Sequence, residues 1–306
     1  MNKNILFMGL ILAASGLVSP PIALLGGLIY GFTLTHPFHV ESKRLAKFLL
    51  QASVVALGFG MNLHEVAHAG RAGFLYTAVS ITVAMLLGLG LGYLIRVGKK
   101  PAFLISAGTA ICGGSAIAAV GPIAEANEEE MAIALGSVFI LNSVALFLFP
   151  AIGYLLHLTQ AQFGLWSALA IHDTSSVVGA TAKYGPTALA VGTTIKLARA
   201  LWIVPLSIVT AVTLKSKARI QWPWFILIFC VAALLNTLLP AWNHAFGALS
   251  HLGKNGLTVT LFLIGTGLNR QTLQRVGLRP LLQGLALWVV VGASTLALIL
   301  LNWIHV

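Results

Sequence analysis

The sequence carries little charge and very little acid. Of its 306 residues only 8% are charged and 58% are hydrophobic, and the seven acidic residues include a single aspartate, Asp173. Soluble domains carry roughly 25% charged residues, so this composition excludes a water-soluble globular protein. Apolar stretches long enough to cross about 30 Å of hydrocarbon recur along the chain, and their length favours helices over barrel strands. We predict an all-α polytopic membrane protein with one transmembrane domain over residues 1–306.

Cysteine is also scarce. Cys112 and Cys230 lie in different hydrophobic segments, which excludes a disulfide framework, and the histidines show no metal-ligand spacing. No metal or cofactor is therefore predicted. The net charge of +11 comes from basic residues scattered over short loops, so it indicates membrane topology rather than nucleic-acid binding.

Eleven hydrophobic segments are predicted, or ten if the first two form one kinked helix. They cover residues 4–18, 21–35, 46–62, 73–95, 102–124, 131–157, 162–182, 187–214, 222–240, 253–268 and 280–304. The basic loops at 43–47, 96–100, 215–219 and 270–279 then fall on one side, and the acidic loop at 125–130 falls on the other. The positive-inside rule places the N-terminus in the cytoplasm and the C-terminus outside the inner (plasma) membrane.

Two glycine motifs recur far apart in the chain. The run Gly58-Phe59-Gly60-Met61-Asn62 matches Gly265-Thr266-Gly267-Leu268-Asn269, and each run ends a hydrophobic segment. Because the copies end the third and tenth segments, they run through the bilayer in opposite directions, as do the inverted repeats of secondary transporters. We predict approximate repeat halves at 20–157 and 162–304, with chance recurrence of Gly-x-Gly as the alternative.

A glycine cluster lies in the middle of the segment 102–124, where Gly113, Gly114 and Ser115 follow Cys112. Each glycine lowers helix stability by about 1 kcal/mol relative to alanine, so a discontinuous helix near mid-membrane is predicted. A broken helix offers backbone N–H groups to an anion at the start of its second half, and Ser115 would add a hydroxyl donor. Close helix packing through small residues is the alternative.

Five consecutive polar residues interrupt a second apolar segment. His172, Asp173, Thr174, Ser175 and Ser176 would cover every face of a regular helix, so we predict an unwound stretch that faces a cavity. A loop between short helices is the alternative. Ionisable groups at membrane depth usually mark an ion or substrate path, which makes Asp173, alone or with His172, the candidate ion-coupling group.

Two cations lie three residues apart in the segment 187–214. Lys196 and Arg199 share a helix face with Thr193. Pairing with Asp173 would offset one positive charge and leave a net positive site, where a guanidinium fork and an ammonium would bind an anion. A structural ion pair between two helices is the alternative. Asn142, like Thr193, is a secondary candidate.

These motifs resemble those of a known family. Residues 112–117, the polar run at 172–176, and Lys196-Leu197-Ala198-Arg199 with Pro205 are similar to the YeiH-type membrane proteins, a family named for sulfate export. The resemblance covers nearly the whole chain. That family is distantly similar to the bile-acid symporters and cation/proton antiporters, whose fold has inverted repeats and crossing discontinuous helices. The resemblance implies an anion transporter without enzyme activity. Family members often have His-Glu where this chain has His172-Asp173, a difference that bears on substrate and coupling ion.

The residues and the resemblance together predict a secondary transporter of a small inorganic or organic anion, such as sulfate, driven by a proton or sodium gradient. The candidate substrate-binding residues are Gly113, Gly114, Ser115, His172, Ser175, Ser176, Lys196 and Arg199. An anion channel is the first alternative, because sequence separates channels from transporters poorly. The second is an intramembrane enzyme using Cys112 or Ser115 with His172, although no nucleophile motif is present. We also allow for a homodimer.

Overall fold

The computed structural model describes residues 2–34, 37–61, 63–216, 224–268, 274 and 276–304. Asn62 and Asn269 of the repeated motif, and the loop residues 217–219 and 270–273, therefore lie outside the described part. The described secondary structure is helical. Its elements are α1 (Asn2–Ala14), α2 (Pro20–Thr33), α3 (His39–Gly58), α4 (Leu63–Ile95), α5 (Lys99–Ala110), α6 (Gly114–Val120), α7 (Glu128–Leu155), α8 (Gln160–Ala170), α9 (Thr174–Tyr184), α10 (Pro186–Leu201), α11 (Ile203–Leu214), α12 (Trp224–Leu238), η1 (Pro240–Trp242), α13 (Asn243–Gly267) and α15 (Leu278–Leu300).

The helices follow the predicted hydrophobic segments, three of which are split. The segment 102–124 forms α5 and α6, and the segment 162–182 forms α8 and α9. Both splits lie at the motifs that predicted a discontinuous helix. The segment 187–214 forms α10 and α11 with only Trp202 between them. The alternative of one kinked helix at the start of the chain is wrong, because α1 and α2 are separate helices.

Four described stretches are long and apolar enough to cross a membrane, and α12 with α13 would make a fifth if this pair, bent by 99°, forms one span. The four are Thr77–Ile95, Glu129–Leu155, Pro186–Leu214 and Leu278–Leu300. The described part of the chain is thus all-helical, with four or five apolar candidate spans. The predicted ten or eleven spans also count shorter apolar helices, such as α1 and α2, and the split helices.

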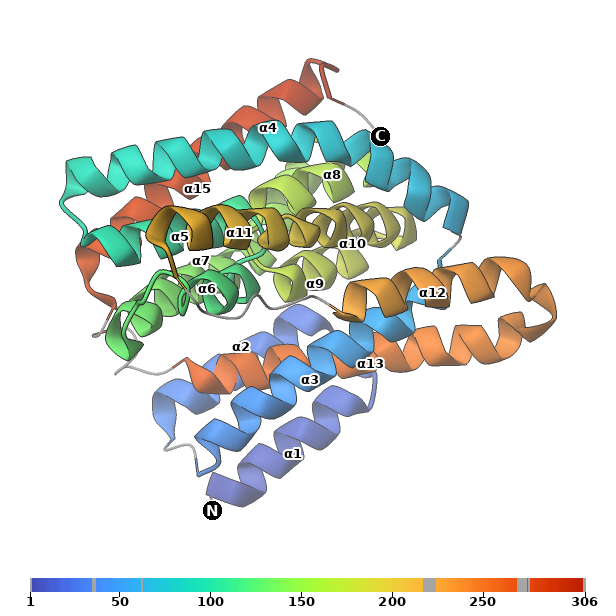
Figure 1. Cartoon of the computed structure of the whole chain (residues 1–306). Coiled ribbons are helices and arrows are strands. Elements are labelled where there is room, and N and C mark those ends of the chain that lie inside the picture. The colour runs from blue at the N-terminus through green and yellow to red at the C-terminus, as the bar shows by residue number, and fades with distance from the viewer. Residues whose placement is uncertain are drawn as a thin grey trace.

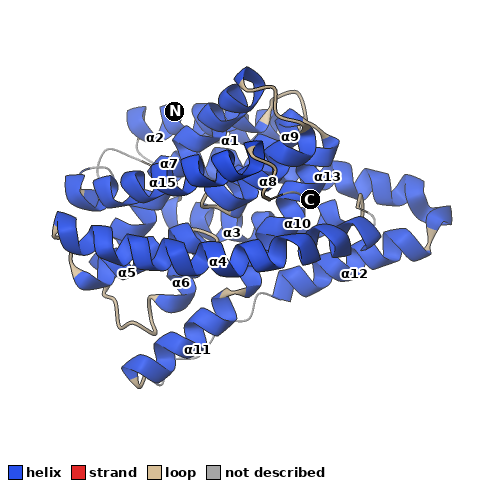
Figure 2. Cartoon of the chain, turned by 90° about the horizontal axis from the view of Figure 1, so that it is seen from above, coloured by secondary structure: helices blue, strands red, loops and turns tan. Residues whose placement is uncertain are grey.

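The helices form two bundles (Figure 1). In the first, α13 packs along α2 and α3, with α1 and α12 beside them; in the second, α4 to α11 pack with α15. The bundles meet where α9 lies against α2 and α13, where α12 lies against α4, and where α2 lies against α7. Figure 2 shows the far ends of α12 and α13 extending beyond the second bundle.

Glycines let backbones touch within the first bundle. A Cβ added at Gly265 would lie only 2.6 Å from the carbonyl oxygen of Leu24 on α2. Gly58, its counterpart in the repeated motif, is also approached closely by another backbone at the end of α3. A Cβ added there would lie 2.7 Å from the carbonyl oxygen of Phe229. Both copies therefore end helices that another backbone approaches closely, a common use of small residues in membrane proteins.

Replacing Gly265 with alanine is expected to lower thermal stability, because a backbone cannot move aside as a flexible side chain would. The overlap should cost about 1–3 kcal/mol, against the roughly 1 kcal/mol that alanine gains over glycine in a helix. Gly267→Ala is the matched control, since nothing lies within 4 Å of its added methyl group. Thermal unfolding in detergent should give the lower midpoint for Gly265→Ala, and equal midpoints would contradict the close contact of α2 with α13.

Candidate functional site

Two of the split segments in the second bundle are interrupted at the predicted motifs, and these two interruptions touch. The first interruption spans residues 111–113, between α5 and α6, and the second spans residues 171–173, between α8 and α9. A Cβ added at Gly113 would lie 3.1 Å from the Cβ of Asp173 and 3.2 Å from its Cα. The glycine cluster and the polar run are far apart in the sequence, but they lie in contact in the structure. We call these two interruptions, with the side chains that reach them, the central site.

Gly113 is glycine for two reasons. Its backbone has φ 63° and ψ −124°, a combination that residues with a side chain rarely adopt. It also lies directly against Asp173, where a methyl group would meet backbone as well as side chain. The sequence predicted the break from the low helix propensity of the cluster, but the contact between the two breaks depends on the tertiary fold.

Asp173 begins α9 as its N-cap residue. One carboxylate oxygen, Oδ2, accepts a hydrogen bond from the backbone N–H of Ser175 at 2.9 Å and another from the Ser175 hydroxyl. The Asp173 N–H donates to Oδ1 of Asn142 on α7 at 3.3 Å. An aspartate in this position satisfies N–H groups of the first turn that would otherwise lack acceptors. The carboxylate therefore already occupies part of the anion-attracting end of α9.

The predicted unwound run is shorter than expected. Thr174, Ser175 and Ser176 belong to the first turn of α9 and are at most 5% exposed, so only residues 171–173 leave the helical path. The prediction that all five polar residues are unwound is wrong, because the carboxylate of Asp173 caps the helix and lets it begin at the next residue. The hydroxyl groups are buried in protein rather than directed toward lipid.

Lys196 and Arg199 reach the two interruptions from α10. Both side chains are fully buried, at 0% exposure. The Nζ of Lys196 donates to the carbonyl of Ile171 at 2.7 Å and to that of Ala168 at 3.4 Å, at the end of α8. Arg199 donates through Nη2 to the carbonyl of Ala110, the last residue of α5. Each cation thus lies at the C-terminal end of a half-helix, where the helix dipole favours positive charge.

The predicted pairing of one of these two cations with Asp173 is not formed. The ammonium donates to backbone carbonyls, and the hydrogen bonds of the carboxylate come from Ser175. Instead of the carboxylate, peptide oxygens that the broken helices expose accept the hydrogen bonds of the cations. Sequence reasoning did not consider these oxygens. Sequence reasoning also missed Ser80 on α4, whose Oγ accepts a hydrogen bond from Nη1 of Arg199 at 2.8 Å. A lone serine in an apolar helix gives no sequence signal for such a contact.

Several buried polar atoms around the central site have no hydrogen-bond partner. They include both ring nitrogens of His172, Nδ2 of Asn142, Oγ1 of Thr193 and Nε of Arg199. Buried polar groups are nearly always paired with protein or water, so such a concentration is unusual. All four side chains offer a donor under any assignment of protons, namely an amide NH₂, a hydroxyl, a guanidinium N–H and at least one imidazole N–H. The unpaired polar atoms of the central site are therefore mainly hydrogen-bond donors.

The remaining predicted site residues lie at the start of α6. Gly114 is half-buried and Ser115 is exposed, whereas the two cations of α10 are fully buried. Cys112, in the first interruption, is buried and carries a free thiol. Neither ring nitrogen of His172 bonds to Cys112 or Ser115. Within the described ranges, no group of three or more His, Cys, Asp or Glu side chains is placed to hold a metal ion.

Fold and site together define an all-helical membrane protein with a charged, buried centre. The family model described as "Conserved hypothetical protein 698" matches residues 5–284. The chain is 48% identical over 294 residues to a UPF0324 membrane protein of Geobacter sulfurreducens, covering 96% of this chain and 95% of that protein. It is 52% identical over 289 residues to a UPF0324 membrane protein of Porphyromonas gingivalis, covering 93% and 88% respectively.

A UPF0324 membrane protein of Bacteroides thetaiotaomicron is 49% identical over 290 residues, with 94% of this chain and 88% of that protein covered. The chain therefore belongs to the UPF0324 (YeiH) family of membrane proteins. No solved structure matches it significantly.

Proposed function

We propose that this protein is a secondary active transporter of a small anion, with sulfate or a related oxyanion as the first candidate. The observation that carries the proposal is the full burial of Lys196 and Arg199 on one face of α10, in an interior whose one aspartate bonds elsewhere. Buried charges without a paired partner are costly to stability. In membrane proteins they usually lie on a substrate or ion path.

The donors of the central site supply the chemistry for an anion. Arg199 keeps its Nε–H unpaired, and Asn142 and Thr193 add an unpaired amide and hydroxyl. Charge-assisted hydrogen bonds from such donors to oxyanion oxygens are about twice as strong as neutral ones. The central site is also bordered by Ser175, Ser176, Gly113 and Gly114. We assign these residues, together with the exposed Ser115, to the substrate path.

Asp173 and His172 are the proposed ion-coupling groups. Binding of a proton to either one, or of sodium to the carboxylate, would change the charge that the anion meets. A site whose charge changes between inward and outward states links the movement of the two ions. Residues 171–173 connect this change directly to the contact with Lys196, which bonds to the carbonyl of Ile171.

The proposal includes the membrane arrangement. Ten or eleven spans in two inverted halves, with the N-terminus in the cytoplasm and the C-terminus outside the plasma membrane, would place the two interruptions near mid-membrane. Transporters commonly place substrate and ion sites at discontinuous helices near that depth. Support comes from the two interruptions that touch at Gly113 and from the two glycine motifs that end α3 and α13 in the same manner.

A thermal-shift screen tests the proposal. Purified protein should unfold at a higher temperature with sulfate or another small oxyanion than with chloride at equal ionic strength, and the response should change with sodium or pH. A ligand at a hundred times its dissociation constant stabilises by about 2.7 kcal/mol. Arg199→Gln should lose the response, while Arg279→Gln, at an exposed arginine, should keep it. An unchanged oxyanion response in Arg199→Gln would contradict the assignment of the site.

Transport in proteoliposomes separates the transporter from the channel. An anion loaded inside should accelerate uptake of the labelled anion outside if binding sites alternate between the two faces. Discrete single-channel current steps in planar bilayers would overturn the transporter in favour of an anion channel.

A further inference from the structure

The guanidinium of Arg199 is held by two helices of different kinds. Its Nη1 donates to the Oγ of Ser80 at 2.8 Å, and its Nη2 donates to the carbonyl of Ala110. Ser80 lies in α4, a continuous helix of 33 residues, whereas Ala110 is the last residue of the half-helix α5. One contact is therefore with a side chain on an unbroken helix, and the other is with a peptide oxygen at an interruption.

The hydroxyl of Ser80 is oriented by its own helix, because it donates to the carbonyl of Thr77 at 3.1 Å. Hydroxyls in helices commonly bond to the preceding turn in this way, as those of Thr82 and Ser294 also do. Since its one proton is used, Ser80 offers only lone pairs to Arg199. A guanidinium has donors and no acceptor, so the Ser80 oxygen complements Nη1 and fixes its direction.

The edge of the guanidinium that remains for a ligand is the one that carries Nε. This nitrogen has no hydrogen-bond partner, although the side chain of Arg199 is fully buried. In a guanidinium, the Nε–H and one N–H of Nη2 point in the same direction, and Nη1 lies on the opposite side. Two parallel N–H groups match two oxygens of one oxyanion. An anion at this edge would take over Nη2 from the carbonyl of Ala110 while Ser80 kept its hold on Nη1.

We infer that Ser80 is a positioning residue of the anion site: it holds Arg199 by Nη1 and so presents the Nε edge of the guanidinium to a bound oxyanion. This inference rests on the proposed function and adds a preference to it. Anions with two oxygens that can each accept one N–H should bind better than a single-atom anion such as chloride. Without Ser80, the guanidinium would have to be ordered at the moment of binding, at a cost in conformational entropy.

Thermal-shift titrations of Ser80→Ala with sulfate and with chloride test the inference. The substitution removes one oxygen atom at a half-buried position, so the fold should persist. The dissociation constant for sulfate should rise about tenfold, near the lower end for a hydrogen bond to a charged group, and the preference for sulfate over chloride should narrow. Ser80→Thr keeps the hydroxyl and should restore most of the sulfate affinity. Ser294→Ala is the matched control, because its hydroxyl also bonds to the carbonyl three residues earlier in its helix.

A second background shows whether Ser80 acts through Arg199. Arg199→Lys keeps the charge but not the planar fork, so Ser80→Ala should weaken sulfate binding less in that background than in the wild type. An equal loss in both backgrounds would mean that Ser80 acts independently of Arg199, which would overturn the inference.

The other outcomes separate this inference from the proposed function. An unchanged sulfate affinity in Ser80→Ala, or a loss that Ser80→Thr does not restore, would make Ser80 merely structural and leave the anion transporter in place. Tighter sulfate binding by Ser80→Ala would show that the hydroxyl competes with the anion, and would also overturn the positioning role. Failure of sulfate and every other small oxyanion to stabilise the wild-type protein would refute the proposed function itself.

Discussion

Replacing Lys196 with methionine is expected to abolish anion binding while leaving the unliganded protein at least as thermostable. Methionine keeps the length of the side chain and removes a buried ammonium that no carboxylate pairs with. Burying a single ion costs several kcal/mol even after relaxation. The substitution leaves the Ile171 carbonyl without its donor, at about 1–3 kcal/mol; the contact with Ala168, at 3.4 Å, is weak. Removing the charge therefore outweighs losing the hydrogen bond.

Thermal unfolding with and without oxyanion measures both halves of this prediction. Lys183→Met is the matched control, because Lys183 is exposed at the end of α9 and its replacement should preserve the anion response. A structural role for Lys196 predicts the reverse pattern, a lower midpoint without ligand and an intact response. That pattern would remove Lys196 from the binding site.

Gly113→Ala is expected to have the second large effect, on both stability and transport. Forcing alanine into the backbone conformation of Gly113 costs about 1–3 kcal/mol. The contact at 3.1 Å with Asp173 adds to this, because one of the neighbouring atoms is backbone. Any relief of the contact must shift residues 171–173, which position the carboxylate and the carbonyl bonded to Lys196.

The control is Gly90→Ala in α4, where an added methyl group meets nothing within 4 Å and alanine should stabilise the helix by about 0.5–1 kcal/mol. Unfolding midpoints and anion uptake in proteoliposomes should both fall for Gly113→Ala. For Gly90→Ala the midpoint should rise slightly and the uptake should stay the same. Normal uptake by Gly113→Ala would mean that the contact between the interruptions is dispensable for transport.

The sequence was informative where a local conflict marks the site. Glycines inside an apolar segment and a polar run beside Asp173 conflict with a continuous membrane helix, and the structure breaks both helices at these points. Likewise, Lys196 and Arg199 could be placed in the interior because their distance from the segment ends leaves them no route to water. The all-helical membrane class follows from composition, and the resemblance to the family rests on the same motifs.

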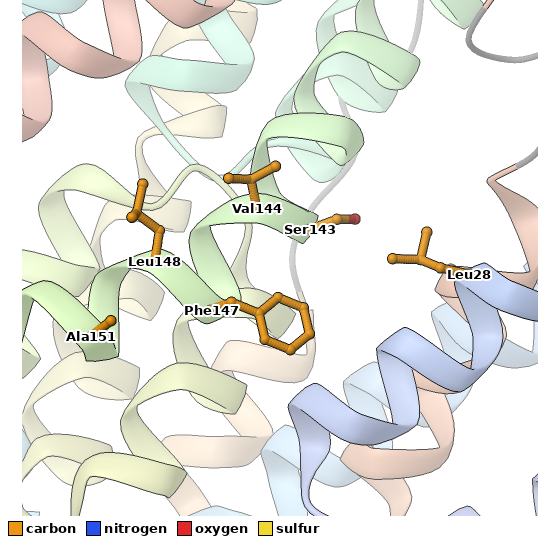
Figure 3. A pocket seen from close by; sticks show the side chains of 6 residues that line it. All are labelled: Leu28, Ser143, Val144, Phe147, Leu148 and Ala151. Atoms are coloured by element: carbon orange, nitrogen blue, oxygen red, sulfur yellow. The ribbon is translucent and has the colours of Figure 1, made fainter.

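The partners of these residues could not be predicted in the same way. A carbonyl is present at every position, so nothing in the sequence shows that Lys196 would bind those of α8 or that Arg199 would bind that of Ala110. The division into two bundles depends on long-range packing, and so does the open apolar groove that Leu28 of α2 and five residues of α7 line (Figure 3). Hydrophobic runs of similar composition do not show such packing. The ion pair with Asp173 was predicted from charge alone, without weighing the acceptors that a broken helix exposes.

The hydrogen bonds of the two cations to peptide oxygens have a thermodynamic consequence. Any solute that recruits Lys196 or Arg199 competes with the carbonyls of Ile171 and Ala110 for the same protons. Solute binding and local order are then reciprocally linked. Binding of the solute should loosen the last turns of α5 and α8, and stabilising those turns should weaken its binding. Because α10 carries both side chains, a change in this one helix would affect both broken helices at once.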